Sequence, residues 1–196
     1  GRSNAGKSSA INTLAGRQRL AFVSKTPGRT QMINFFALAA DKFLVDLPGY
    51  GYAKAPEALR DNWGQLVSAY LQQRRALRGL VLVMDIRHPL TELDLKLLGF
   101  ARAQALPVHA LLTKCDKLSR AEAMRTLTQV RAQLDSTRET AQLFSSLKRI
   151  GLDEAEARIA HWLGLAPKPS SAVNSMSAAG ENRKRAAAHK ANPRAK

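Results

Sequence analysis

The first eight residues of the chain have the spacing of a phosphate-binding loop. Gly1, Gly6, Lys7 and Ser8 complete the pattern G-x-x-x-x-G-K-S, whose glycines let consecutive backbone N–H groups turn toward one ligand. Such amides bind anionic phosphate, while Lys7 would reach the outer phosphates and the Ser8 hydroxyl would bind Mg²⁺. The pattern predicts a nucleoside triphosphate site, and the residues expected to contact the phosphates are Gly1, Arg2, Ser3, Asn4, Ala5, Gly6, Lys7 and Ser8.

A second polar group follows an apolar segment further along the chain. Asp46-Leu47-Pro48-Gly49 has the pattern D-x-x-G, in which the aspartate holds Mg²⁺, usually through water, and the glycine N–H contacts the γ-phosphate. The pattern is short, and an Asp46 that merely caps a turn is the alternative. A phosphate loop alone leaves kinases, ATPases and G proteins open, and the D-x-x-G pattern favours the last of these.

The stronger discriminator among these classes is Thr113-Lys114-Cys115-Asp116, which is similar to the guanine-reading pattern N-K-x-D. Asp116 would accept two hydrogen bonds from the ring N–H and exocyclic amine of guanine, an edge that adenine does not present. Lys114 would lay its aliphatic stem over the base, and Cys115 would be an unreactive neighbour. Thr113 replaces the usual Asn, which would weaken the bonds that fix the loop. The alternative is that Asp116 only caps the next helix.

Predicted strands and helices alternate along the chain. Short apolar runs predict strands, and apolar residues at helical spacing predict helices. This alternation predicts a doubly wound, mostly parallel α/β sheet, in which the first two strands form a hairpin. The predicted strands cover about 32–39, 43–46, 79–85, 107–113 and 141–144. The predicted helices cover about 6–16, 56–75, 91–104, 119–134 and 153–163, with Asp153 expected to cap the last one.

The strand that normally feeds a phosphate loop lies in the middle of such a sheet, and the sequence given has nothing before Gly1. We therefore expect this chain to lack that strand, with a gap wide enough for one strand between 43–46 and 80–85. Two neighbouring strands would then expose unpaired backbone, so the chain is expected to fold poorly alone.

The composition indicates one domain followed by a basic tail. The 196 residues are 45% hydrophobic, enough for a single core, and we assign 1–165 to a nucleotide-binding domain. Residues 166–196 hold seven Lys and Arg residues against one acidic residue and predict a disordered tail. The formal net charge of +16 favours a polyanionic partner such as RNA, with a solvated basic surface as the alternative.

Cysteine content and hydropathy point to a compartment. The one cysteine, Cys115, excludes an internal disulfide and a multi-cysteine metal site, as expected of a reducing cytoplasm. No apolar run approaches the roughly 18 residues needed to cross a bilayer. We predict a cytoplasmic monomer without a membrane partner. His88 has no ligand-type residue at metal-binding spacing and is predicted to be a structural loop residue.

Several segments together resemble one family, the EngB (YsxC/YihA) GTPases of bacteria. These segments are GRSNAGKSS, 24–31, DLPGYGYA, DIRHPL, TKCDKL and 144–146, and they occur in the family's order over residues 1 to about 165. The resemblance implies a GTP-binding domain that assists assembly of the large ribosomal subunit and is associated with normal cell division and septation. It also implies Mg²⁺ as cofactor, GTP and GDP as ligands, and the large-subunit precursor or its rRNA as partner.

The resemblance assigns further site residues by position. It makes Ser8 and Thr30 the Mg²⁺ ligands, with Thr26 as the competing candidate for the latter role. Residues in the first switch segment would be Gly28, Arg29, Thr30, Gln31 and Met32. The last base-contacting loop would contain Phe144, Ser145 and Ser146, where a backbone N–H meets the guanine carbonyl.

Catalytic roles are predicted for Lys7, Thr30 and Gly49, at the γ-phosphate end of the site. Tyr50 occupies the position at which many G domains carry a water-orienting Gln, so slow intrinsic GTP hydrolysis is expected. Two other functions stay open at this point: a P-loop ATPase or kinase, and a basic RNA-binding module in which the nucleotide is structural.

Overall fold

The computed structural model describes residues 1–2, 4–16, 33–49 and 69–166. The elements described below all belong to one folded unit, Gly1–Leu165. Several predicted features lie wholly or partly outside the described residues and stay predictions. They are Ser3, Thr26, the switch residues 28–32, Tyr50, residues 56–68 of the helix predicted at 56–75, and residues 167–196 of the tail predicted at 166–196. In the part of the chain that is described, no helix is long and apolar enough to cross a membrane.

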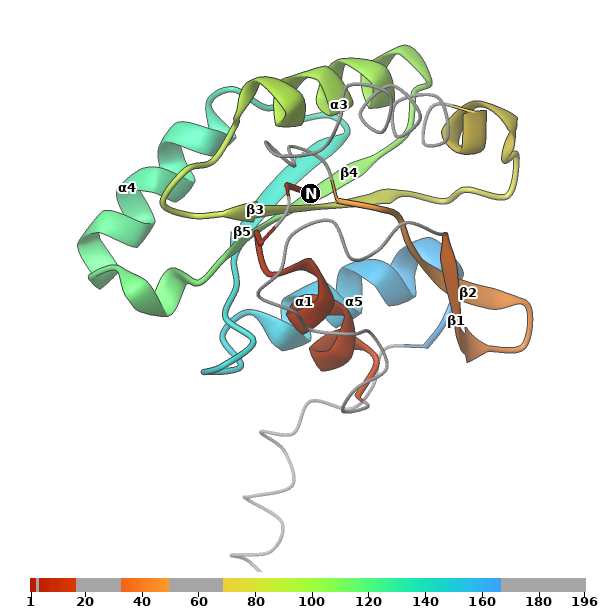
Figure 1. The fold of residues 1–196 in the computed structure, drawn as a ribbon, viewed down its shortest axis with the longest axis horizontal. Coiled ribbons are helices and arrows are strands. Elements are labelled where there is room, and N and C mark those ends of the chain that lie inside the picture. Colours follow the sequence, from red (N-terminus) through yellow and green to blue (C-terminus); the bar gives the residue numbers. More distant parts are fainter. Residues whose placement is uncertain (3, 17–32, 50–68, 167–196) are drawn as a thin grey trace, which may run out of the picture. The chain divides into compact units, whose positions relative to one another are not determined.

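A three-stranded parallel sheet forms the centre of the unit (Figure 1). β3 (Leu80–Asp85) pairs with β4 (Val108–Thr113), which pairs with β5 (Glu139–Leu143). Every residue of β4 is buried, as expected of a central strand covered on both faces. Because all three strands run in one direction, their carboxyl ends meet at one edge, and Asp85 lies opposite Thr113 there.

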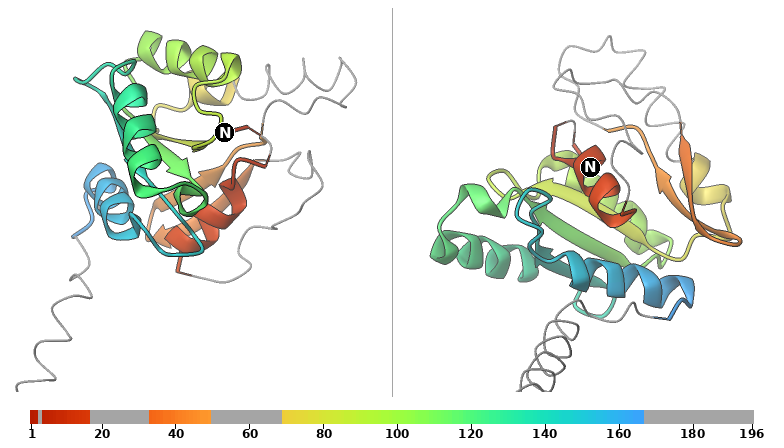
Figure 2. Two further views of the ribbon diagram at one scale, coloured as in Figure 1. Left: turned by 90° about the vertical axis from the view of Figure 1, so that its left-hand side faces the viewer. Right: turned by 90° about the horizontal axis from the view of Figure 1, so that it is seen from below.

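Helices cover both faces of this sheet (Figures 1 and 2). α3 (Glu92–Ala103) and α4 (Arg120–Arg131) lie on one face, and α1 (Lys7–Leu14) and α5 (Leu152–Leu163) lie on the other. One apolar cluster packs α3 and α4 against the sheet, and a second packs α1 and α5. The doubly wound α/β architecture is therefore confirmed, with a 3₁₀ turn, η1 (Cys115–Lys117), directly after β4.

The hairpin forms a second, separate sheet. β1 (Asn34–Ala39) pairs antiparallel with β2 (Lys42–Asp46) through a turn at Ala40 and Asp41, whose φ is 56°. In the described part of the chain, β2 is not paired with β3. Instead, residues of both strands line a cavity of about 330 Å³, among them Leu44, Val45, Val81 and Val83. The lack of pairing agrees with the expected gap between these strands, and a width of one strand stays a prediction.

The predicted helix boundaries need two corrections. Asp153 does not cap α5: the N-cap is Gly151, in a left-handed conformation with φ 71°, and Asp153 lies inside the first turn, where its charge favours the helix dipole. At α4 the helix ends at Arg131, before Leu134, and Met124 is 47% exposed, so the apolar spacing there overstates both the length and the burial of the helix. By contrast, the start of α3 carries a capping box formed by Thr91 and Asp94.

Candidate nucleotide-binding site

The phosphate loop turns sharply into α1. Asn4 and Gly6 have φ values of 62° and 93°, and the Ala5 N–H donates to the Arg2 carbonyl at 3.1 Å. Gly6 is the N-cap of α1 and carries no side chain to satisfy the first helical amides. The loop therefore presents backbone N–H groups and the positive end of the helix dipole at one place, the arrangement that binds phosphate.

The lysine of this loop is held by the hairpin. The Lys7 ammonium forms an ion pair with the Asp46 carboxylate at the end of β2. The Asp46 side chain is only 3% exposed, and that of Lys7 is 15% exposed. This pair brings the lysine of the G-K-S pattern and the aspartate of the D-x-x-G pattern together, although they lie on separate elements. Ser8 lies in the first turn of α1, and Gly49 follows shortly after β2.

Thr113 ties the phosphate loop to the end of β4. Its hydroxyl donates to the Ala5 carbonyl at 2.5 Å and also lies 2.9 Å from the Met84 carbonyl. The threonine is 3% exposed, so both contacts lie in the protein interior. The threonine therefore bonds the phosphate loop directly, and the expectation that it fixes the loop less well than an asparagine stays a prediction.

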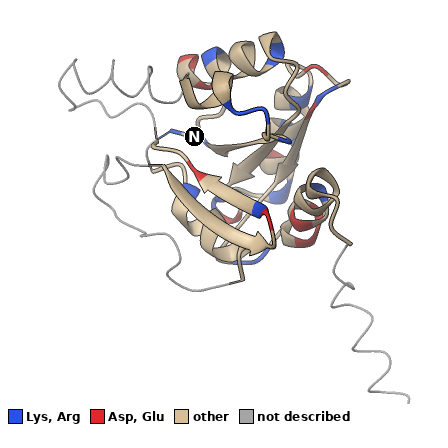
Figure 3. Ribbon diagram, turned by 90° about the vertical axis from the view of Figure 1, so that its right-hand side faces the viewer, with Lys and Arg blue, Asp and Glu red and all other residues tan. Residues whose placement is uncertain are grey.

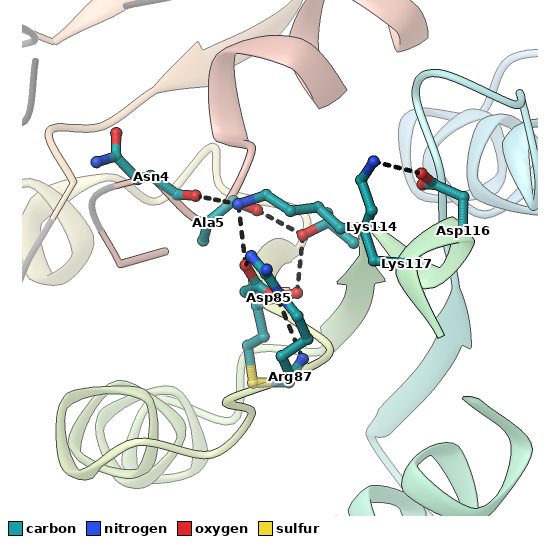
Figure 4. Close-up of polar contacts among 9 residues, drawn as sticks. Asn4, Ala5, Asp85, Arg87, Lys114, Asp116 and Lys117 are labelled. Atoms are coloured by element: carbon teal, nitrogen blue, oxygen red, sulfur yellow. Dashed lines mark hydrogen bonds and ion pairs between the residues drawn. The ribbon is translucent and has the colours of Figure 1, made fainter. Parts of the chain in front are cut away.

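Lys114 makes a second link to the phosphate loop. Its backbone is left-handed, with φ 59°, and its ammonium donates to the Asn4 carbonyl at 2.7 Å and to Asp85 at 2.9 Å (Figure 4). Asp85 also accepts a hydrogen bond from the Arg87 guanidinium at 2.6 Å. The motif that would read the base and the loop that would hold the phosphates are therefore joined by direct contacts.

Asp116 is oriented by the loop after β5. The Ser145 hydroxyl donates to the Asp116 carboxylate at 2.5 Å, and Lys117 lies 3.9 Å from its other oxygen. Ser145 is buried and pairs with Ile150 through two backbone bonds of 3.0 and 3.1 Å, which close the loop. Phe144 is fully buried, so its side chain anchors the loop in the core. The carboxylate keeps only 10% of its surface exposed, at the edge of the sheet.

Cys115 is buried and His88 is exposed. Burial, and after it the charge of Asp116, raises the pKa of the Cys115 thiol, which disfavours the reactive thiolate. His88 is exposed in the turn after β3, and its backbone N–H donates to the Asp85 carbonyl at 2.9 Å. Among the described residues, no group of three or more His, Cys, Asp or Glu side chains could hold a metal ion.

Known proteins match both the sequence and the fold. Residues 1–114 match the profile of the family described as 50S ribosome-binding GTPase. The chain is 61% identical over 165 residues to the probable GTP-binding protein EngB of Methylobacillus flagellatus, covering 83% of this chain and 80% of the relative. It is 57% identical over 175 residues to the probable GTP-binding protein EngB of Neisseria meningitidis serogroup B, covering 87% and 84%.

This chain belongs to the EngB family of GTPases. Membership makes it a GTP-binding protein, implies hydrolysis of GTP, and decides against the ATPase or kinase alternative. Solved structures agree with this chain in fold. Their sequences are too different from this chain to show more than the fold. A probable GTP-binding protein engB matches with a TM-score of 0.68 at 18% identity, covering 82% of this chain and 94% of that chain. Aquifex aeolicus Era bound to GDP and aluminium fluoride matches with a TM-score of 0.65 at 19% identity, covering 86% and 56%.

Within this candidate site, the sequence did not indicate the contacts of Asp85 with Arg87 and Lys114. In the sequence, Asp85 and Arg87 are noticed only as part of the family segment DIRHPL, to which no function was assigned. A signal was present nonetheless: Asp85 ends a predicted buried strand, and the carboxyl ends of parallel strands converge where such folds bind ligands.

Proposed function

We propose that this EngB protein binds GTP and GDP between its phosphate loop and the segment Thr113–Asp116, and hydrolyses GTP slowly. We further propose that it acts in the cytoplasm, as a monomer, in assembly of the large ribosomal subunit, and that normal cell division and septation depend on it. The observation that carries the nucleotide proposal is the direct link between the two ends of the site, from the Thr113 hydroxyl to the Ala5 carbonyl.

Base selection is proposed for Asp116. Its carboxylate accepts a bond from Ser145, and four lone-pair sites on two oxygens leave it able to accept from the guanine N–H and amine as well. Adenine offers no such pair of donors, and a buried carboxylate left unpaired costs binding energy. Backbone N–H groups of Ser145 and Ser146 are the proposed donors toward the guanine carbonyl, but the Ser145 N–H already donates to Ile150, which favours Ser146.

The phosphate end has the donor set that a magnesium nucleotide needs. Lys7 supplies a cation, the loop Gly1–Ser8 supplies amides, and Ser8 and Asp46 supply the hard oxygens that Mg²⁺ prefers. Bound there, Mg²⁺ would neutralise charge on the β- and γ-phosphates. Thr30 is the proposed second direct ligand. The Lys7–Asp46 pair fits this use, because both groups already lie together and can turn toward a phosphate and its metal.

Hydrolysis is proposed to be slow in the isolated protein. Lys7 and the N–H groups of Thr30 and Gly49 would stabilise charge that develops on the γ-phosphate. Tyr50 has no amide with which to orient water as Gln does, so a partner would have to complete the site. Single-turnover measurements with isolated protein should give a rate far below that of an arginine-assisted G domain. An equally fast rate would contradict this part of the proposal.

The ribosomal partner is supported by the description of the matched family and by charge. The chain carries a net charge of +16, and Lys and Arg lie on several elements of the described unit (Figure 3). A switch requires different affinities in its two nucleotide states, whereas a static RNA-binding module does not. Binding to purified large subunits should therefore be stronger with a non-hydrolysable GTP analogue than with GDP. Equal affinities would favour the module instead.

Asp116→Asn tests the nucleotide proposal. An asparagine presents a donor where guanine needs an acceptor, so GDP affinity should fall about 100-fold or more while xanthosine diphosphate gains. Asp153→Asn, in the first turn of α5, is the matched control and should keep the preference for GDP. Equilibrium titration of both nucleotides against both variants gives the answer. Unchanged GDP binding in Asp116→Asn would overturn the assignment.

A further inference from the structure

Asp85 lies where β3 ends beside the base-reading segment. Its register partner is Thr113, the last residue of β4. Lys114 is the next residue along the chain and therefore lies beside Asp85. The Asp85 side chain is 14% exposed, at the edge of the interior. The carboxylate is therefore a neighbour of the site, although Asp85 is not one of the residues that the guanine pattern predicts.

Lys114 is held at both sides by the contacts of its ammonium. One N–H donates to the Asn4 carbonyl of the phosphate loop at 2.7 Å, and another donates to Asp85 Oδ2 at 2.9 Å. Figure 4 shows the ammonium between these two acceptors, with the aliphatic stem running back to the end of β4. Fixing the far end of a lysine also fixes its stem, which is the part expected to lie over the base.

Arg87 in turn fixes the carboxylate of Asp85. The guanidinium donates from Nε to Oδ1 at 2.9 Å and from Nη2 to Oδ2 at 2.6 Å, and the Arg87 backbone N–H donates to Oδ1 at 3.1 Å. Burial alone would raise the pKa of Asp85, but the hydrogen bonds from Arg87 and Lys114 hold it well below its usual range. The group is therefore an anion with one fixed orientation.

We propose that Asp85 is a positioning residue for the nucleotide, which acts through Lys114 to slow nucleotide release, and that Arg87 fixes its orientation. This inference rests on the proposed guanine-nucleotide site. Asp85 does not touch the nucleotide itself: it keeps the lysine stem over the base and bound to the phosphate loop, so that both ends of the site hold one geometry. Pre-positioning of this kind lowers the entropy lost on binding.

The Asp85→Asn variant provides the first measurement. It keeps the shape of the side chain but removes the charge that pairs with Lys114, so GDP should dissociate about tenfold faster. The preference for GDP over ADP should remain, because Asp116 is untouched. Glu92→Gln is the matched control, since it neutralises an exposed carboxylate that also pairs with a lysine, Lys96, and it should release GDP at the wild-type rate.

A double-mutant cycle separates positioning from a general loss of stability. Lys114→Met should itself speed GDP release, and adding Asp85→Asn to it should change the rate little, because the carboxylate acts through that lysine. A structural role would instead make the two effects multiply. Arg87→Gln, an exposed position that should not affect folding, is expected to speed release about threefold through the looser carboxylate.

The outcomes distinguish the inference from the function beneath it. Failure of the wild-type protein to bind GDP in preference to ADP would overturn the proposed site. Wild-type binding with unchanged release from Asp85→Asn and Arg87→Gln would overturn only the role of Asp85. If Asp85→Asn does not fold, the double-mutant cycle is run with Arg87→Gln in its place. Independent effects of Arg87→Gln and Lys114→Met on GDP release would then also overturn the role of Asp85.

Discussion

The proposed base end of the site stands on three paired parallel strands, whereas the proposed phosphate end lies between that sheet and a separate hairpin. The strand ladder brings Met84 close to Thr113, and Asp85 close to Lys114. The loop after β5 brings Ser145 close to Asp116. At the other end, Asp46 comes from β2, whose sheet does not include β3 in the described residues. The segment proposed to read the base is thus positioned by the strand ladder, while the proposed phosphate end depends on an ion pair between α1 and β2.

The largest expected effect concerns the cavity between β2 and β3. An apolar strand of about six residues added upstream of Gly1 should raise the free energy of unfolding by roughly 4 kcal/mol. Two or three buried Val or Ile side chains contribute about 1.5–3 kcal/mol each, and the backbone hydrogen bonds of the added strand, about 1 kcal/mol each, offset most of the entropy lost on ordering it. Urea denaturation checks this. The same extension with a central proline cannot complete the pairing and should gain much less. Equal gains from both would mean that the cavity is not a strand site.

The next effect concerns the ion pair that connects Lys7 of α1 to Asp46 of β2. Lys7→Met leaves the buried Asp46 carboxylate uncompensated and should lower the free energy of unfolding by about 3 kcal/mol without nucleotide. Adding Asp46→Asn should restore most of that loss. Lys96→Met, which breaks an exposed pair with Glu92, should leave the free energy of unfolding nearly unchanged. If single and double variants are equally unstable, the pair does not hold the hairpin.

A smaller effect is expected in the loop that supports Asp116. A Cβ at Gly151 would overlap the Leu143 carbonyl oxygen, and φ is 71°, so Gly151→Ala should cost about 2 kcal/mol or more. Gly164 has a similar φ of 62° with nothing within 4 Å, so Gly164→Ala isolates the backbone cost of about 1 kcal/mol. Thermal unfolding of the two variants compares them. Equal losses would show that the loop yields to the added methyl group.

The smallest effect is the pH dependence of the free energy of unfolding that His109 of β4 contributes. His109 of β4 is buried, bonds Thr140 and Gln142 at 2.7 Å each, and its pKa is lowered chiefly by burial. Arg158, Glu154 and Arg131 are the charges that act on it. His109 therefore binds a proton more readily in the unfolded chain than in the folded one. As a result, the free energy of unfolding is highest above about pH 6.5 and decreases as the pH falls below that value. His109→Gln should flatten the slope of unfolding free energy between about pH 7.5 and 5.5. An unchanged slope would contradict this assignment.

The sequence was a good guide wherever a pattern was long or chemically distinctive. Continuous apolar runs located β3 and β4, and apolar residues at helical spacing located α3. The sequence was a poor guide where three-dimensional neighbours decide. Asp153 has the residue type of a cap, but Gly151 takes that place because its left-handed backbone ends the preceding loop.

The site follows the same rule. The patterns named Lys7 and Asp116 but carried no information about the partners of those residues. The bonds of Ser145 to Asp116, and of Asp85 to Lys114, join residues 29 positions apart in each case. Such pairs are created by strand register, which a single sequence does not specify.

The buried Cys115 thiol gives this protein a built-in reporter. It is the one cysteine of the chain, lies between Lys114 and Asp116, and is 6% exposed. A neutral alkylating reagent can reach it only when the segment around it opens, so the rate of alkylation measures how often that opening occurs. The alkylation rate therefore reports the opening of the segment that contains Lys114 and Asp116, without any added label.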